Sequence, residues 1–273
     1  MALYDIIDEI VGKQVTKSDT GDARIFGAMI GVVAKNYDKD MPGRVCVAIP
    51  TREKKANELQ WARLALVSGG KEWGHYFMPE VGDQVLLVFE GGNIEKPYIV
   101  GCVSKDGDKF LTGSVDENNQ TKRIVTKNGS TLIFEDHKSS DDKDNNKDKI
   151  TLSTATAKHT LLLDNENNII TLTDKKKENR IQIKTKDGDM SIKAKSKVTI
   201  AVGDKIKLIL NGESGAVSLK CEQLNVESSE QVKVKGGHML KAEAAQITQT
   251  ASSGYKVESS GMVNIAGSTI KIG

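Results

Sequence analysis

The second half of the chain repeats short apolar pairs at every other residue, without the spacing of an amphipathic helix. Alternation of period two places apolar side chains on one face of a strand and polar side chains on the other. The centres of the pairs recur about every 7 to 11 residues, which indicates a repeat architecture rather than a compact domain. We therefore expect residues 149–273 to form a series of strands. The pairs and triplets are Ile150/Leu152, Leu161/Leu163, Ile170/Leu172, Ile181/Ile183, Met190/Ile192, Val198/Ile200/Val202, Ile206/Leu208/Leu210, Val217/Leu219, Leu224/Val226, Val232/Val234, Tyr255/Val257, Val263/Ile265 and Ile270/Ile272.

One such series cannot bury its own apolar face. A single-chain β-helix needs coils of roughly 20 residues or more, about twice the repeat found here. Three chains that each give one strand per layer would close a triangular prism without free sheet edges along its sides. We therefore predict a homotrimer with no isolated folded monomer, and in such a prism all backbone groups would pair between chains.

Composition separates the chain into two halves with different cores. Aromatic residues make up only 4% of its 273 residues, and Tyr255 alone lies after Lys138. A slender β-helix suits this composition, because small aliphatic side chains suffice to fill it. The formal net charge is +2, which argues against a dedicated nucleic-acid-binding protein.

The first 104 residues divide into an N-terminal segment and a small β domain. Residues 2–14 have helical apolar spacing, and residues 1–23 are expected to be a short helix and a linker. The helix could pack on its own domain or dock on a partner. Its candidate docking residues are Leu3, Ile6, Ile7 and Ile10. Residues 24–104 carry five strand signals separated by turn signals, which predicts a closed five-stranded barrel of the OB type. The expected strands are residues 25–34, 44–49, 60–66, 84–89 and 98–103.

Bulky side chains are expected to fill this barrel, and glycines to shape its turns. The candidates for filling are Trp61, Tyr76, Phe77 and Phe89. Gly82 and the pair Gly91-Gly92 are expected to adopt turn conformations closed to other residues.

The barrel segment resembles a known family. The resemblance rests on Gly43-Arg44-Val45, Trp61-Ala62-Arg63, Pro79 to Val85, Phe89 to Gly92 and Pro97 to Gly101, in this order over about 80 residues. These motifs are similar to the OB-fold domain of the phage baseplate assembly protein V family and of the VgrG spikes of type VI secretion. Residues 123–138 look like the segment that joins this barrel to the VgrG β-helix. The connector, residues 105–148, ends in a highly charged run that we expect to be a solvated loop.

The resemblance implies an all-β fold: a short N-terminal helix, the OB-fold barrel, and an intertwined trimeric β-helix spike over residues 149–273. It also implies a structural spike at the centre of a baseplate that pierces a cell envelope. The family's large hub domain does not precede the barrel, so the resemblance implies a separate hub protein at the OB end. A PAAR-like protein is expected to cap the tip at Ile270, Lys271, Ile272 and Gly273.

No enzymatic chemistry is expected. The sequence contains no HxH, HExxH, GxSxG, GxGxxG or GxxxxGK[ST] motif, and its three cysteines have no metal-ligand spacing. We expect no cofactor and no metal. No signal peptide or apolar run of about 18 residues is visible, so we expect synthesis in the cytoplasm, assembly into a particle, and only transient contact with a target membrane. The alternative is a receptor- or saccharide-binding trimeric tail fibre. The sequence does not distinguish phage, bacteriocin and injection system.

Overall fold

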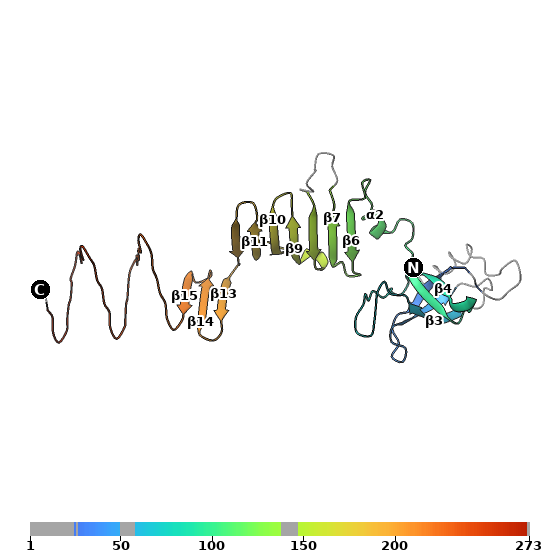
Figure 1. Ribbon diagram of the computed structural model, residues 1–273, viewed down its shortest axis with the longest axis horizontal. Helices are drawn as coiled ribbons and strands as arrows, with labels where there is room; N and C mark the ends of the chain where they lie inside the picture. The colour runs from blue at the N-terminus through green and yellow to red at the C-terminus, as the bar shows by residue number, and fades with distance from the viewer. Residues whose placement is uncertain (1–24, 26, 50–57, 138–146, 272–273) are drawn as a thin grey trace. The chain divides into compact units, whose positions relative to one another are not determined.

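The computed structural model describes residues 25, 27–49, 58–137 and 147–271, and its regular secondary structure is almost entirely β (Figure 1). The chain divides into two compact units, Met1–Lys195 and Ser196–Gly273, which are described separately. The candidate docking helix lies outside the described residues. The expected all-β class and the five-stranded barrel are confirmed.

The barrel is closed, in the strand order β1-β2-β3-β5-β4. All neighbours pair antiparallel except β3 and β5, which run parallel over two residue pairs. A 3₁₀ turn, η1 (Glu90–Gly92), joins β4 to β5. Three of the five predicted strands begin or end within a few residues of the observed bounds, and two coincide with them. The strands are β1 (Met29–Lys35), β2 (Arg44–Ile49), β3 (Glu58–Leu64), β4 (Gln84–Phe89) and β5 (Pro97–Cys102).

Small aliphatic side chains fill the barrel. Its buried cluster is Met29, Val33, Val45, Val47, Ile49, Ala62, Val85, Leu87 and Ile99. The predicted aromatic filling is wrong for Tyr76 and Phe77, which are 68% and 64% exposed. Phe89 packs only against the edge of the cluster, and Trp61 is half-buried. A narrow five-stranded barrel has room for branched aliphatic side chains, so its aromatic residues lie outside.

Two glycines in the barrel occupy positions where a side chain would be unfavourable. Gly82 has φ of +94°, which confirms the predicted turn conformation. Gly31 has no such φ, but a Cβ there would lie 2.7 Å from Cδ1 of Leu87, which is fully buried. Gly31 therefore makes room for a core side chain.

A seven-stranded antiparallel sheet follows in the same unit, in the order β12-β11-β10-β9-β8-β7-β6. Each strand pairs with the next in the sequence, so the chain forms a meander of hairpins. A short helix, α2 (Lys109–Thr112), precedes it, and η2 (Ala155–Ala157) joins β8 to β9. The strands are β6 (Thr121–Val125), β7 (Thr131–Glu135), β8 (Lys149–Ser153), β9 (His159–Asp164), β10 (Ile169–Asp174), β11 (Arg180–Lys184) and β12 (Asp189–Lys193).

The second unit contains a three-stranded antiparallel sheet in the order β13-β14-β15. Its strands are β13 (Lys197–Val202), β14 (Ile206–Asn211) and β15 (Ala216–Lys220). After Lys220 the described chain, to residue 271, contains no strand and is drawn as a trace that winds back and forth (Figure 1). Among the described residues, the strands predicted beyond this point have no hydrogen-bonded strand partner.

In-chain pairing corrects one expectation. Backbone groups of β6–β12 and β13–β15 pair with neighbouring strands of the same chain, whereas the sequence predicted pairing between chains. Turns of a few residues, rich in Asp, Asn and Gly, join these strands, and such turns favour hairpins over exchange between chains. The sheet also begins at β6, upstream of residue 149.

Candidate assembly surface

One face of the seven-stranded sheet carries two continuous rows of apolar side chains, which we call the apolar face. The pairing register aligns the first row across all seven strands: Ile124, Leu132, Leu152, Leu161, Leu172, Ile181 and Ile192. The second row lies two residues away on six strands: Phe134, Ile150, Leu163, Ile170, Ile183 and Met190. A one-residue slip in any strand would break both rows, so the register is strongly specified.

These rows are open to solvent in the single chain. Leu152 is 51% exposed, Leu172 is 49% exposed and Ile192 is 65% exposed. No described element covers them. Thirteen aligned aliphatic, methionine and phenylalanine side chains form a contiguous patch of a kind that soluble proteins normally bury against a partner.

The opposite face of the sheet is mostly polar, and several of its side chains hydrogen-bond to one another, although the buried Nε of Arg180 has no partner among the described residues. Its central row on β8–β12 is Thr151, Leu162, Thr171, Gln182 and Ser191. Thr171 is only 8% exposed and lies 3.4 Å from Nε2 of Gln182, measured at its Oγ1. On the flanking row the hydroxyls of Thr131 and Ser153 are 2.7 Å apart. The two faces therefore differ in polarity.

Hydrogen-bonded carboxylates hold the hairpin turns at the sheet margins. Asp164, only 6% exposed, accepts hydrogen bonds from the Asn167 backbone at 3.1 Å and its side-chain amide at 2.9 Å. Lys149 lies 3.8 Å from Asp164 and 2.6 Å from Glu166. Burial opposes ionisation of Asp164, but the Asn167 hydrogen bonds and the Lys149 charge outweigh it, so its pKa is lowered. The carboxylate thus fixes the turn between β9 and β10.

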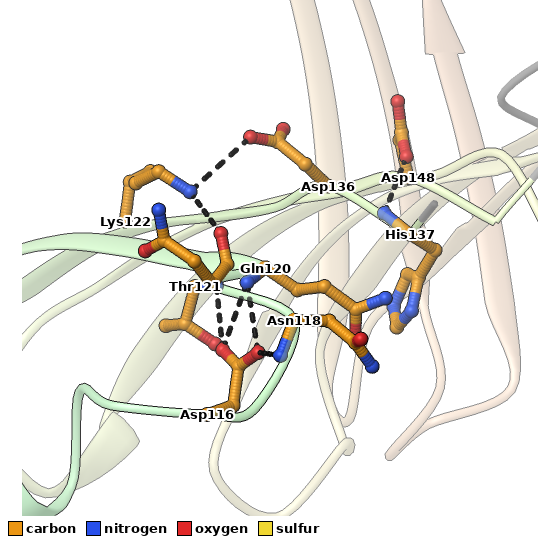
Figure 2. Close-up of polar contacts among 9 residues, drawn as sticks. Asp116, Asn118, Gln120, Thr121, Lys122, Asp136, His137 and Asp148 are labelled. Atoms are coloured by element: carbon orange, nitrogen blue, oxygen red, sulfur yellow. Dashed lines mark hydrogen bonds and ion pairs between the residues drawn. The ribbon is translucent and has the colours of Figure 1, made fainter. Parts of the chain in front are cut away.

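The connector before β6 is fixed in the same way (Figure 2). The Asp116 carboxylate accepts backbone hydrogen bonds from Asn118, Gln120 and Thr121 at 2.9 to 3.0 Å. Its pKa is lowered, chiefly by the hydrogen bond from Gln120. Lys122 pairs with Asp136 at 3.8 Å across β6 and β7.

Arg123 then ties the connector to the sheet. Its Nε donates to Oγ of Ser114 at 2.7 Å, and its Nη2 donates to the Phe110 carbonyl at 2.8 Å. Its guanidinium also stacks 5.2 Å from the centre of the Phe110 ring. Arg123 alternates with Ile124 of the first apolar row, so these contacts lie on the polar face and leave the apolar face open.

The second unit repeats the pattern on a smaller sheet. Its aligned apolar residues are Val198, Leu210, Val217, Ile200, Leu208, Leu219, Val202 and Ile206. Val217 is 72% exposed and Ile200 is 50% exposed. Beyond β15 the predicted alternation continues with exposed side chains, from Leu224 at 63% to Ile270 at 51%. This unit also lacks a partner for its apolar side chains.

Two hollows lie on the described surface. The first, of about 380 Å³, is lined by His159, Leu172, Asn179 and Ile181 together with Thr173, Asp174, Arg180 and Lys193. It indents the margin of the apolar face. The second, of about 370 Å³, lies on the barrel and gathers Arg44, Trp61, Arg63, Glu90, Glu95, Lys96, Pro97 and Tyr98.

The sequence analysis missed the second hollow, because its residues come from β2, β3 and the β4–β5 segment without a local motif. Glu90 accepts hydrogen bonds from the Tyr98 hydroxyl at 3.0 Å and from Lys96 at 3.2 Å, and these lower its pKa. Two carboxylates therefore offset most of the positive charge that three cations bring to this hollow.

The other predicted site residues either lie outside the described residues or are exposed. Leu3, Ile6, Ile7 and Ile10 lie outside the described residues, as do Ile272 and Gly273 at the tip. Ile270 and Lys271 are both exposed. Among described residues, no group of three or more His, Cys, Asp or Glu side chains is placed to hold a metal ion. No helix in the described part is long and apolar enough to cross a membrane.

Comparison with known proteins bears on the barrel. Residues 29–103 match the type VI secretion system/phage-baseplate injector OB domain. The predicted resemblance to baseplate and VgrG-type spikes is confirmed. Two curated relatives of Pseudomonas aeruginosa, the type VI secretion system spike proteins VgrG2a and VgrG2b, are each 29% identical over 107 residues. The match takes in 36% of this chain, but only 13% and 10% of those relatives, which are therefore much longer than the matched region.

Proposed function

We propose that this chain is the central spike of a contractile tail or injection apparatus, a homotrimer whose stiff point pierces a target envelope. The apolar face is the observation that carries the proposal. It is fixed in register across seven strands, solvent-exposed in one chain, and follows a barrel that matches an injector OB domain. Burying it against copies of the chain would remove the exposed patch and build a rigid shaft.

Strand length favours three chains. The strands of both sheets contain five or six residues, so each sheet is about 17–20 Å wide at ~3.4 Å per residue. In a triangular prism the distance from a face to the axis is about 0.29 of the side, or roughly 5–6 Å. Sheets that pack face to face lie about 10 Å apart, so each contributes about 5 Å of side chain. Three sheets of this width fill their interior, whereas four would leave an axial void.

The segment from Cys221 to Lys271 is proposed to pair with the other two chains. It keeps the apolar alternation of the earlier strands but has no strand partner within the described chain. Unpaired backbone groups are strongly driven to find partners when their side chains are buried. Intertwining would therefore begin where the in-chain hairpins end, after β15.

The remaining partners follow from the family resemblance. We place a separate hub protein at the barrel end, reached by Leu3, Ile6, Ile7 and Ile10, and a PAAR-like cap at Ile270 to Gly273. Deletion of residues 1–22 should weaken hub binding while the trimer persists. Deletion of residues 268–273 should abolish cap binding.

Mass and amide exchange of the full chain test the proposal. Light scattering should give three times the 29.6 kDa chain mass. Hydrogen exchange should be slow both in β13–β15 and in residues 222–271, because copies protect the latter. A monomer, or a dimer, would refute the threefold assembly. A trimer with fast exchange throughout residues 222–271 would refute the intertwined segment.

A second candidate, a saccharide-binding module, is favoured by the barrel hollow with Trp61 and Tyr98. Aromatic rings beside hydrogen-bonding side chains are common in sugar sites. Calorimetry with peptidoglycan fragments or lipopolysaccharide sugars, with Tyr98→Ala as the control variant, decides it. Binding that this substitution removes would support the second candidate.

A further inference from the structure

The barrel carries an ordered hairpin, residues 68–77, that no function described above uses; we call it the aromatic hairpin. A bridge between Gly69 and Gly74 closes it, with backbone hydrogen bonds from Gly70 to the Trp73 carbonyl at 2.8 Å and from His75 to the Ser68 carbonyl at 2.9 Å. The Ser68 hydroxyl and Nδ1 of His75 are also 2.8 Å apart. The hairpin is thus shaped before it meets any partner.

Two glycines allow this shape. Gly74 has φ of +153°, and a Cβ there would lie 2.8 Å from both the Gly69 Cα and the Ser68 carbonyl oxygen. A Cβ on Gly70 would lie 2.6 Å from Nε1 of Trp73. The indole therefore rests against Gly70, with 68% of the Trp73 side chain still exposed.

Apolar side chains on and beside the hairpin point to an interface. Trp73, Tyr76 and Phe77 are 64–68% exposed, and Val67 is 92% exposed. Rigid, exposed Trp and Tyr side chains are typical of the residues that dominate binding energy in protein interfaces. The partner is therefore expected to be a protein surface with apolar character.

The position of the hairpin and the charges at its tip favour a second copy of this chain as the partner. Pro79, two residues after Phe77, is buried, and Glu80 pairs with Lys127 in the β6–β7 turn at 2.8 Å. Phe77 is three residues, or at most about 10 Å along the chain, from Glu80. The partner of Glu80, Lys127, follows Ile124 of the first apolar row by three residues. The hairpin tip presents Lys71 beside Glu72, both exposed and without an ion-pair partner among described residues. A basic and an acidic residue side by side suit a second copy in a cyclic arrangement, where each can face its opposite.

We propose that the aromatic hairpin packs against the aromatic hairpin of a neighbouring copy, with Lys71 of one copy facing Glu72 of the next. This contact rests on the proposed trimer and adds a second ring of interactions at the barrel level. It would hold the three barrels together independently of the spike.

Trp73 fluorescence tests the contact, because Trp61 is the other tryptophan of the chain. In the Trp61→Phe variant of the full chain, acrylamide should quench Trp73 several-fold less in the assembled protein than in guanidinium. Should Trp61→Phe impair folding, subtraction of a Trp73→Phe spectrum from that of the wild type gives the same readout. Lys71→Glu should increase quenching by placing like charges together, and the Lys71→Glu/Glu72→Lys double variant should restore protection.

Light scattering on the same samples separates this inference from the trimer itself. A trimer in which Trp73 is quenched as freely as in guanidinium would overturn the inference and leave the trimer standing. A monomer would overturn both. Protection of Trp73 that appears only after a hub protein or a glycan is added would assign the hairpin to that partner and overturn the contact between copies.

Discussion

Replacing Leu152 by alanine should destabilise the protein far more than its exposure in the single chain suggests. Leu152 lies in the first apolar row and is 51% exposed. If the chain functioned alone, losing a half-exposed leucine would cost about 1 kcal/mol, half of the value for a fully buried side chain. In the proposed trimer the same side chain would be fully buried, and the substitution should then cost about 2–5 kcal/mol in each copy.

Leu162→Ala is the matched control, because Leu162 lies on the neighbouring strand β9 but on the polar face. It is half-buried in the single chain and would gain no cover in the proposed assembly. Guanidinium unfolding followed by circular dichroism, at fixed protein concentration, should show the larger loss of stability for Leu152→Ala. If Leu162→Ala is equally or more damaging, the apolar face is not an interface and the reasoning fails.

Three further substitutions examine local contacts. Asp164→Asn should lower the melting temperature at pH 7, and the difference should shrink as pH falls below the unfolded pKa of about 3.9 and through the lower folded pKa, because the stabilisation is full only above the unfolded value and is lost once the folded carboxylate is protonated; a difference that stays constant down to about pH 2 would contradict this. Arg123→Leu should speed proteolysis of residues 105–119 by releasing both hydrogen bonds, whereas equal cleavage of variant and wild type would show that they do not order the connector. Gly31→Ala should cost about 1–3 kcal/mol by crowding buried Leu87, while Gly101→Ala, with open space at its Cβ, should not; thermal melts that rank them in the reverse order would count against the barrel packing.

The sequence predicted the barrel strands well because turn residues mark their ends. Gly43 and Gly82 both have positive φ, and each sits just before a strand that begins where it was expected. The side chains that fill the barrel could not be predicted in the same way. Hydrophobicity alone does not tell a core aromatic residue from one displayed on a hairpin, so Tyr76 and Phe77 were placed inside.

The sequence also predicted which side chains share a face, but not which strands are neighbours. Period-two alternation fixes the face of Ile170 and Leu172 whether the adjacent strand belongs to the same chain or to another. Short turns such as residues 165–168 and Asp187-Gly188 were the available signal for in-chain hairpins. The barrel hollow had no comparable signal, because strands distant in the sequence bring Arg44 and Tyr98 together.

The uniform strand length has an evolutionary consequence. Every strand of both sheets spans five or six residues. In the proposed prism the packing distance would permit little else, because two more residues per strand would widen it by about 7 Å and open its axis. Adding or deleting a hairpin would change the length of this prism but not its cross-section. Spikes built on this plan can therefore lengthen or shorten freely by duplication, while their calibre stays fixed.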